Sequence, residues 1–218
     1  MKLSRILPPL AAVILFASLL TLIYRPQYAI NIHYLGRPDP FSYHEQRQKV
    51  LRVLDPQIPP GSVIFLGDSL TERLPVEQLG ANIYNLGVSG DTIKDLSNRI
   101  DDYTSLKSAR LIVLEIGTNN ANNFREGDLS ELAAKLPAVS VLWYAAPPVD
   151  KKIIKGTDID KINQKAAELC AKINNCNFVN LTDQFSDSAG NLKYHIGDGV
   201  HFNVEANQIW LNDLKSRL

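Results

Sequence analysis

The stretch Ser-Val-Ile-Phe-Leu-Gly-Asp-Ser-Leu at residues 62–70 joins a short apolar run to a polar turn. Four consecutive large apolar side chains are typical of a strand that is buried on both faces, as in a parallel sheet. Gly67 and Asp68 end the run, and Ser69 stands where a helical pattern begins. The stretch therefore predicts a buried strand that ends at a turn carrying a serine hydroxyl.

The same alternation of apolar runs and helical patterns continues to the end of the chain. Such alternation is typical of right-handed βαβ units, in which helices cover both faces of a parallel sheet. We therefore expect an α/β fold, a flavodoxin-like three-layer α/β/α sandwich with a five-stranded parallel sheet. Strands are expected at 63–66, 83–86, 111–116, 139–145 and 178–181, and helical patterns at 74–79, 93–103, 129–136, 162–173 and 204–218.

The N-terminal end of the chain has a different composition. Residues 6–24 are uncharged and mostly apolar, and Lys2 and Arg5 precede them. A bilayer span needs about 20 apolar residues, whereas the apolar part of a cleaved signal peptide has about 7 to 15. The length favours a membrane anchor that leaves the rest of the chain outside the cytoplasm, in the periplasm or the extracellular space. The alternative is a signal peptide whose cleavage releases a secreted protein.

Composition also predicts how the chain is organised. Residues 1–24 are the expected transmembrane anchor or signal segment, and residues 25–60 are a linker followed by a lead-in helix at 41–53. Residues 61–218 are the expected folded domain, which is long enough for one ordinary hydrophobic core and hardly for two. We therefore expect a single site.

Charge and motifs exclude several classes of partner. Lysine plus arginine equals aspartate plus glutamate at 23 each, so the formal net charge is zero and no nucleic acid is expected as a partner. The sequence contains no zinc-protease, phosphate-loop or dinucleotide-binding motif, so no cofactor and no metal is expected.

Two cysteines and one sequon have two interpretations each. Cys170 and Cys176 are too few for a four-ligand zinc site; they could pair in an exported domain, or remain two partly buried thiols. Asn180-Leu181-Thr182 is an N-glycosylation sequon, but it falls on an expected buried strand, so we interpret it as chance.

Polar residues follow the apolar runs, at the sheet edge where open parallel sheets bind their ligands. Ser69 follows the first run, and a serine nucleophile needs a base within hydrogen-bond reach that is oriented by a third group. Asp198 and His201, three residues apart before the last helix, supply that pair. The N–H groups of Ser69 and Gly90 and the side-chain amide of Asn119 are candidate donors to an oxyanion.

Four sequence blocks together resemble the SGNH (GDSL-type) family of serine esterases. The blocks are Gly-Asp-Ser-Leu at 67–70, Asn-Leu-Gly-Val-Ser-Gly-Asp-Thr at 85–92, Gly-Thr-Asn-Asn at 117–120 and Asp-Gly-Val-His at 198–201. The resemblance extends from about residue 43 to the C-terminus and implies the SGNH hydrolase fold for 61–218. It implies that Ser69 is the nucleophile, that Asp198 and His201 complete the triad, and that Gly90 and Asn119 complete the oxyanion hole. Many members of the family have Asp at the position of Asn120.

Several of these residues have a competing interpretation. Ser69 could cap the following helix, and Asn119 could satisfy the backbone of a turn. Ser89 is a rival nucleophile, but the G-x-S-x-G elbow is missing around it. His195 is a rival base, but it has no carboxylate at a matching spacing and is expected to lie in a loop or at the rim of a pocket. His44 precedes the expected fold and carries no hypothesis.

The sequence therefore predicts a serine carboxylic-ester hydrolase that acts outside the cytoplasm through an acyl-enzyme. Its expected substrate is a short-chain acyl or O-acetyl ester of a small molecule or a carbohydrate. One alternative is an O-acyltransferase that uses the same triad. The other is a non-catalytic glycan-binding module.

Overall fold

The computed structural model describes residues 42–154 and 158–218. Contacts divide the chain into two compact units, Met1–Tyr43 and His44–Leu218. The expected anchor or signal segment at 1–24 lies outside the described residues, as do residues 25–41 of the expected linker and lead-in helix. Among the helices in the described part of the chain, none is both long enough and apolar enough to cross a membrane.

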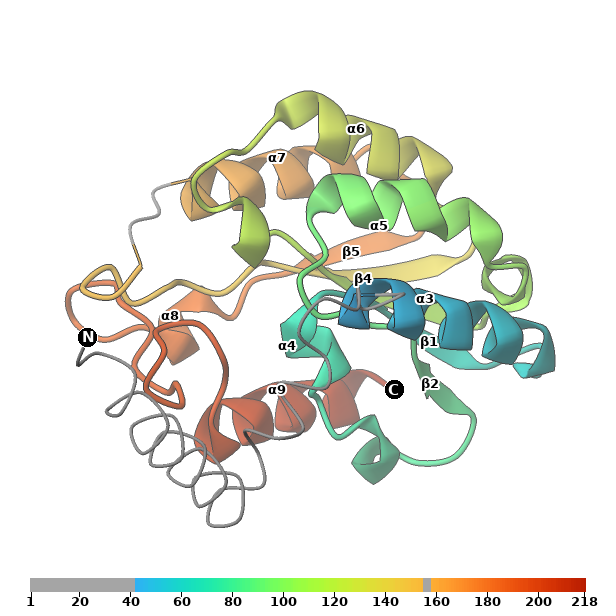
Figure 1. The fold of residues 1–218 in the computed structure, drawn as a ribbon, viewed down its shortest axis with the longest axis horizontal. Helices are drawn as coiled ribbons and strands as arrows, with labels where there is room; N and C mark the ends of the chain where they lie inside the picture. The colour runs from blue at the N-terminus through green and yellow to red at the C-terminus, as the bar shows by residue number, and fades with distance from the viewer. Residues whose placement is uncertain (1–41, 155–157) are drawn as a thin grey trace, which may run out of the picture. The chain divides into compact units, whose positions relative to one another are not determined.

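A five-stranded, all-parallel sheet forms the centre of the unit His44–Leu218 (Figure 1). The strand order is β2-β1-β3-β4-β5, and β1 is buried at all five of its positions. This arrangement confirms the predicted α/β fold. The strands are β1 (Val63–Gly67), β2 (Ile83–Asn85), β3 (Leu111–Glu115), β4 (Ser140–Tyr144) and β5 (Cys176–Val179).

Helices cover both faces of this sheet because successive strand residues point to opposite sides. Ile64 and Leu66 pack into one core cluster, whereas Val63 and Phe65 pack into the other. On the first face lie α3 (Tyr43–Leu54), α5 (Ile93–Arg99), α6 (Glu126–Lys135) and α7 (Ile159–Cys170). On the second face lie α4 (Ser69–Glu72), α8 (Thr182–Phe185) and α9 (Val204–Arg217).

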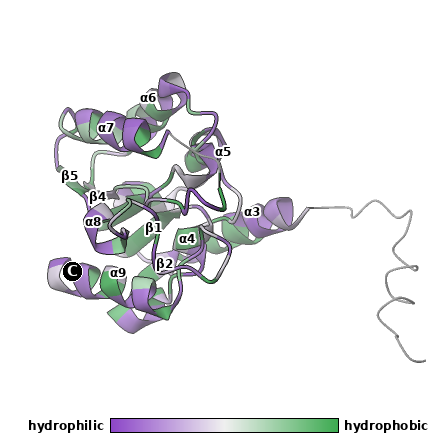
Figure 2. Cartoon of the chain, turned by 90° about the vertical axis from the view of Figure 1, so that its left-hand side faces the viewer, coloured by the Kyte–Doolittle hydropathy of each residue, from purple (hydrophilic) through white to green (hydrophobic). Residues whose placement is uncertain are grey.

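The helices show the amphipathic pattern that such a sandwich requires. In α7 the buried residues Ile159, Ile162, Ala166 and Cys170 recur every three or four positions, so they form one apolar face. Figure 2 shows hydrophobic and hydrophilic residues alternating along α6 and α7, as expected for helices with one side against the sheet. Helix burial thus follows from the sequence pattern.

Two predicted helical patterns differ from the structure. The pattern at 74–79 forms only a short 3-10 helix at Val76–Leu79, which begins after Pro75. The pattern at 93–103 is α-helical only to Arg99 and continues as a 3-10 helix at Ile100–Asp102, which tightens the last turn. The remaining 3-10 helices of the described residues are Asp55–Gln57, Ser105–Ser108 and Thr118–Asn120.

The structure decides between the two interpretations of the cysteines and corrects that of the sequon. Cys170 and Cys176 form a disulfide with a Cα–Cα distance of 5.3 Å, which joins the end of α7 to the start of β5. The interpretation of the sequon as buried was wrong. β5 ends at Val179, and Asn180 is exposed in a turn where its Oδ1 accepts hydrogen bonds from the N–H and hydroxyl of Thr182.

Candidate active site

Three side chains from the two ends of the domain meet beyond the carboxyl end of β1. Ser69, the first residue of α4, lies with its Oγ 2.9 Å from Nε2 of His201, although 132 positions separate the two residues in the chain. Nδ1 of His201 lies 2.6 Å from Oδ2 of Asp198. The structure therefore brings the three predicted triad residues together in one hydrogen-bonded chain.

Asp198 orients His201 through several hydrogen bonds. Its Oδ1 accepts from the N–H groups of Val200 and His201 at 3.0 and 2.9 Å, while its Oδ2 faces the imidazole. Partial burial opposes ionisation, but these bonds outweigh it and lower the pKa of Asp198 to about 2. An ionised Asp198 holds the proton of His201 on Nδ1, which leaves the lone pair of Nε2 directed at the Ser69 hydroxyl.

The helix-capping interpretation does not apply to Ser69. Asp68 is the N-cap of α4, and its Oδ1 accepts a hydrogen bond of 2.9 Å from the N–H of Leu70. The Ser69 hydroxyl is thus available to His201, and its N–H lies in the first turn, where a helix offers no partner. Ser89, the rival nucleophile, donates its backbone N–H to Glu72 at 2.5 Å, and the histidine of the triad contacts Ser69 instead.

The predicted oxyanion donors come from the loops after β2 and β3. Gly90 has a φ of 86°, a conformation that favours glycine, and it is exposed. Asn119 donates one amide hydrogen to the carbonyl of Asp91 at 2.9 Å, which ties the two loops together. Asn120 is buried, and its Oδ1 accepts from the N–H of Ile93 at 2.8 Å. Asn120 therefore has a structural contact, whereas Asn119 stands at the exposed edge.

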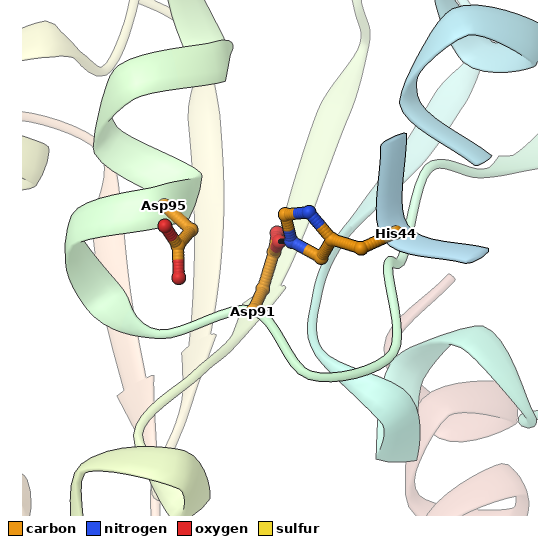
Figure 3. A group of neighbouring side chains, drawn as sticks. All are labelled: His44, Asp91 and Asp95. Carbon is orange, nitrogen blue, oxygen red and sulfur yellow. Dashed lines mark hydrogen bonds and ion pairs between the residues drawn. The ribbon is translucent and has the colours of Figure 1, made fainter. Parts of the chain in front are cut away.

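A buried ion pair that the sequence does not reveal holds the loop after β2, which contains Gly90. Asp91, which follows Gly90, is 0% exposed, and its Oδ2 accepts from Nε of Arg99 at 2.6 Å. Its Oδ1 lies 2.6 Å from Nε2 of His44 in the lead-in helix (Figure 3). Arg99 also donates to the carbonyl of Gly67 at 3.2 Å. Asp91 thus connects the loop to α3 and α5, and Arg99 connects the ion pair to the end of β1.

The group of His44, Asp91 and Asp95 is not a convincing metal centre, although its ligand atoms lie within 4.8 Å of one another. The Arg99 guanidinium already neutralises Asp91 from 2.6 Å. Asp95 accepts hydrogen bonds from the N–H and hydroxyl of Thr92 in a capping box at the start of α5. The polar atoms of this group therefore have partners within the protein.

Two buried carboxyl groups lie at the carboxyl ends of β1 and β3, and one of them directly precedes Ser69 in the chain. The parallel pairing of Gly67 with Glu115 places Asp68 and Glu115 at neighbouring strand ends. Burial raises the pKa of Asp68 to about 7, and the nearby charge of Asp91 adds to the shift. Burial, and then the charge of Asp68, raises the pKa of Glu115 well above its ordinary value. Burial thus opposes the ionisation of both carboxyl groups.

His195 has the carboxylate partner that its sequence neighbourhood does not offer. Its Nε2 lies 3.4 Å from Oδ2 of Asp150, in the loop after β4, and its Nδ1 accepts from the N–H groups of Gly197 and Gly199. Both ring nitrogens therefore have partners away from Ser69. Spacing along the sequence could not reveal this pair, because Asp150 lies in the loop after β4, far from His195 in the chain.

A parallel α/β sandwich with a serine, a histidine and an aspartate aligned at its carboxyl edge has the architecture of a serine hydrolase. The chain belongs to the GDSL-like lipase/acylhydrolase family, whose sequence model matches residues 65–209. The resemblance seen in the sequence blocks is thereby confirmed. No curated protein matches the chain at a significant level.

Solved structures share the fold. A protein from Streptococcus pneumoniae described as a presumptive platelet activating factor has a TM-score of 0.70 at 24% identity, over 80% of this chain and 92% of its own. An acetyl xylan esterase has a TM-score of 0.58 at 21% identity, over 72% and 99%. The C-terminal catalytic domain of peptidoglycan O-acetyltransferase A from Streptococcus pneumoniae has a TM-score of 0.56 at 16% identity, over 72% and 92%.

Proposed function

We propose that the protein is a serine carboxylic-ester hydrolase that removes short acyl groups, in particular O-acetyl groups, from a carbohydrate or small-molecule alcohol outside the cytoplasm. The observation that carries the proposal is the chain from Ser69 Oγ to His201 Nε2 at 2.9 Å and from His201 Nδ1 to Asp198 Oδ2 at 2.6 Å. A serine, an acceptor nitrogen and an ionised carboxylate in this order form a nucleophile, a base and an orienting group.

The reaction proceeds in two steps on these groups. The Ser69 hydroxyl attacks the ester carbonyl while His201 takes its proton, and His201 then delivers that proton to the leaving alcohol. The resulting acyl-Ser69 ester is attacked by a water molecule that His201 deprotonates, and the acid and free serine are released.

The negative charge of each tetrahedral intermediate needs hydrogen-bond donors. The N–H groups of Ser69 and Gly90 and the second amide hydrogen of Asn119 are the donors that we assign to it. A single donor of this kind contributes roughly 2.7 to 4 kcal/mol to the transition state. The bond from Asn119 to the Asp91 carbonyl holds the amide in place before the substrate binds.

A short acyl group is supported by solved structures that share the fold. Two proteins of the same fold carry names that refer to acetyl transfer or acetyl ester cleavage on polysaccharides.

An extracytoplasmic location is supported by two separate features. The Cys170–Cys176 disulfide belongs to compartments that are oxidising, such as the periplasm or the cell exterior. The uncharged apolar residues 6–24 have the composition of a membrane anchor or export signal. The location is tested by detergent extraction and by N-terminal sequencing of the mature protein, which distinguish an anchor from a cleaved signal.

The activity is tested with the purified full-length chain on p-nitrophenyl esters of increasing acyl length and on an acetylated polysaccharide. Acetyl esters are expected to be the best substrates, and Ser69→Ala and His201→Ala are each expected to lower kcat roughly a thousandfold or more. Thermal unfolding of each variant serves as the control for folding. Unchanged activity of Ser69→Ala would refute the assigned nucleophile, and preference for long chains would refute the acetyl assignment.

The same assay distinguishes hydrolysis from transfer. An added acceptor alcohol leaves the yield of free acetate unchanged if water is the natural acceptor. Formation of an acetylated acceptor at the expense of free acetate would instead identify an O-acyltransferase with the same acyl-Ser69 intermediate.

A further inference from the structure

The loop that carries the acid–base pair is organised around His195. Nδ1 of His195 accepts hydrogen bonds from the N–H of Gly197 at 3.0 Å and from the N–H of Gly199 at 3.2 Å. These two glycines are the immediate neighbours of Asp198 in the chain. A single ring nitrogen thus holds the backbone on both sides of the aspartate that orients His201.

This contact defines the protonation state of the ring. A nitrogen that accepts two N–H groups carries no hydrogen, so Nδ1 of His195 is unprotonated and the single ring hydrogen is on Nε2. Nε2 faces Oδ2 of Asp150 at 3.4 Å, and the carboxylate therefore favours the tautomer that the loop requires. Asp150 acts on Nε2 of His195, whereas Asp198 acts on Nδ1 of His201. The two Asp–His pairs hence have opposite tautomers.

The backbone of the loop is tied to the segment that contains Asp150. The N–H of Asp150 donates to the carbonyl of Gly199 at 2.8 Å. A Cβ atom on Gly199 would lie 3.0 Å from Cβ of Ile153, and the φ of this glycine is 80°. At the other end, the N–H of Ile196 donates to the carbonyl of His201 at 3.0 Å. Close contact, left-handed backbone and hydrogen bonds thus give the loop one shape.

We propose that His195 is a positioning residue for the acid–base pair: its neutral imidazole, oriented by Asp150, holds Asp198 where it can orient His201. The inference rests on the proposed function, because it assigns His195 a role through that triad. His195 itself is no rival base, since both of its nitrogens are occupied by partners other than Ser69. The glycines permit the loop conformation, and the histidine selects it.

The inference is tested with three variants of the full-length chain. His195→Asn keeps a hydrogen-bond acceptor at the position of Nδ1. His195→Gln keeps a polar group only near the position of Nε2. His195→Phe keeps an aromatic ring that has neither polar atom. The readouts are kcat and KM for p-nitrophenyl acetate, and the low-field proton resonance of the His201–Asp198 hydrogen bond. Lys193→Ala, an exposed change in the same segment, is the matched control.

We expect His195→Asn and Lys193→Ala to keep kcat within about threefold, and His195→Gln and His195→Phe to lower it about tenfold to a hundredfold with little change in KM. The low-field resonance should persist in the Asn variant and be lost in the Gln and Phe variants. If the Phe variant does not fold, as judged by circular dichroism, the Asn and Gln variants decide alone.

Equal kcat values and an unchanged resonance in the Asn and Gln variants would overturn the inference. The resonance also separates this result from a failure of the proposed function. A wild-type chain that cleaves no ester but shows the resonance, and loses it in His195→Gln, would refute the esterase proposal and leave the positioning role intact.

Discussion

The two sides of the active site are held in different ways. The oxyanion side, residues 85–92 with Arg99, depends on a buried ion pair in which Asp91 and Arg99 are 0% and 2% exposed. On the base side, residues 195–201 with Asp150, the side chains of Asp198 and His201 are 41% and 24% exposed. A buried charge is compatible with a stable fold only while its partner remains. An exposed loop, in contrast, can lose a contact at little cost in stability. Substitutions in this buried ion pair should therefore mainly lower stability, and substitutions on the base side should mainly lower turnover.

The largest effect is expected for Arg99→Met on the oxyanion side. This change leaves the Asp91 carboxylate buried without its cation, so the free energy of unfolding should fall by about 3–5 kcal/mol. Urea denaturation measures the loss. Arg52→Met is the matched control, because the Arg52–Asp102 pair is exposed and should contribute at most about 1 kcal/mol. Equal losses in the two variants would contradict the comparison.

The next effect concerns pH and the buried carboxyl group of Asp68. Asp68 has a pKa of about 7 in the folded protein and 3.8 as its ordinary value, so the folded state binds a proton more tightly than the unfolded state. Its contribution to stability is complete below pH 3.8 and is lost as the pH rises through 7, a change of about 2–4 kcal/mol. Urea denaturation from pH 5 to pH 8 should show this decrease.

Asp68→Asn should flatten that pH dependence, because its side chain no longer takes up a proton. Asp160→Asn, a substitution at an exposed residue, should leave the profile unchanged. A decrease between pH 5 and pH 8 that persists in Asp68→Asn would show that another group, such as Glu115, takes up the proton.

A smaller effect is expected from removal of the disulfide. It lies at the start of β5, whereas the site lies beyond the carboxyl ends of the strands. It closes a loop of only six positions, so Cys170→Ser with Cys176→Ser should lower stability by about 2 kcal/mol. Turnover on p-nitrophenyl acetate should stay unchanged at 25 °C, because neither side of the site contacts this loop. A lower kcat in the folded double variant would show that the disulfide influences the active site, which would contradict this prediction.

The smallest effect is expected for His44→Ala in the lead-in helix. His44 contributes one hydrogen bond to Asp91 and is partly exposed, so water can replace its ring nitrogen. Stability should fall by about 1 kcal/mol. A loss as large as that of Arg99→Met would show that α3, rather than the buried ion pair, holds the oxyanion side.

The strands, and the grouping of Ser69, Asp198 and His201, could be predicted because both leave local signals. Four apolar residues before Gly67 mark a strand, and Asp198 and His201 stand three positions apart. The pairs His44–Asp91 and Asp150–His195 leave no such signal, because each joins segments that only the fold brings together. The raised pKa of Asp68 is similarly a result of burial, which cannot be measured from one sequence.

The error on the sequon has a different origin. An apolar run shows that a strand is present more clearly than it shows where the strand ends. The end of β5 at Val179 rather than at residue 181 was enough to move Asn180 from the interior to the surface. Strand ends also carry most of the chemistry in this fold, so small errors there matter more than elsewhere.

The separation of 132 positions between Ser69 and His201 has a consequence for biosynthesis. A ribosome adds the histidine 132 positions after the serine. A nascent chain, or one that has not docked its last helix, therefore carries a serine with no histidine beside it. The hydrogen bond that connects the two residues forms only after the segment with His201 has been made and has folded against the strand that precedes Ser69.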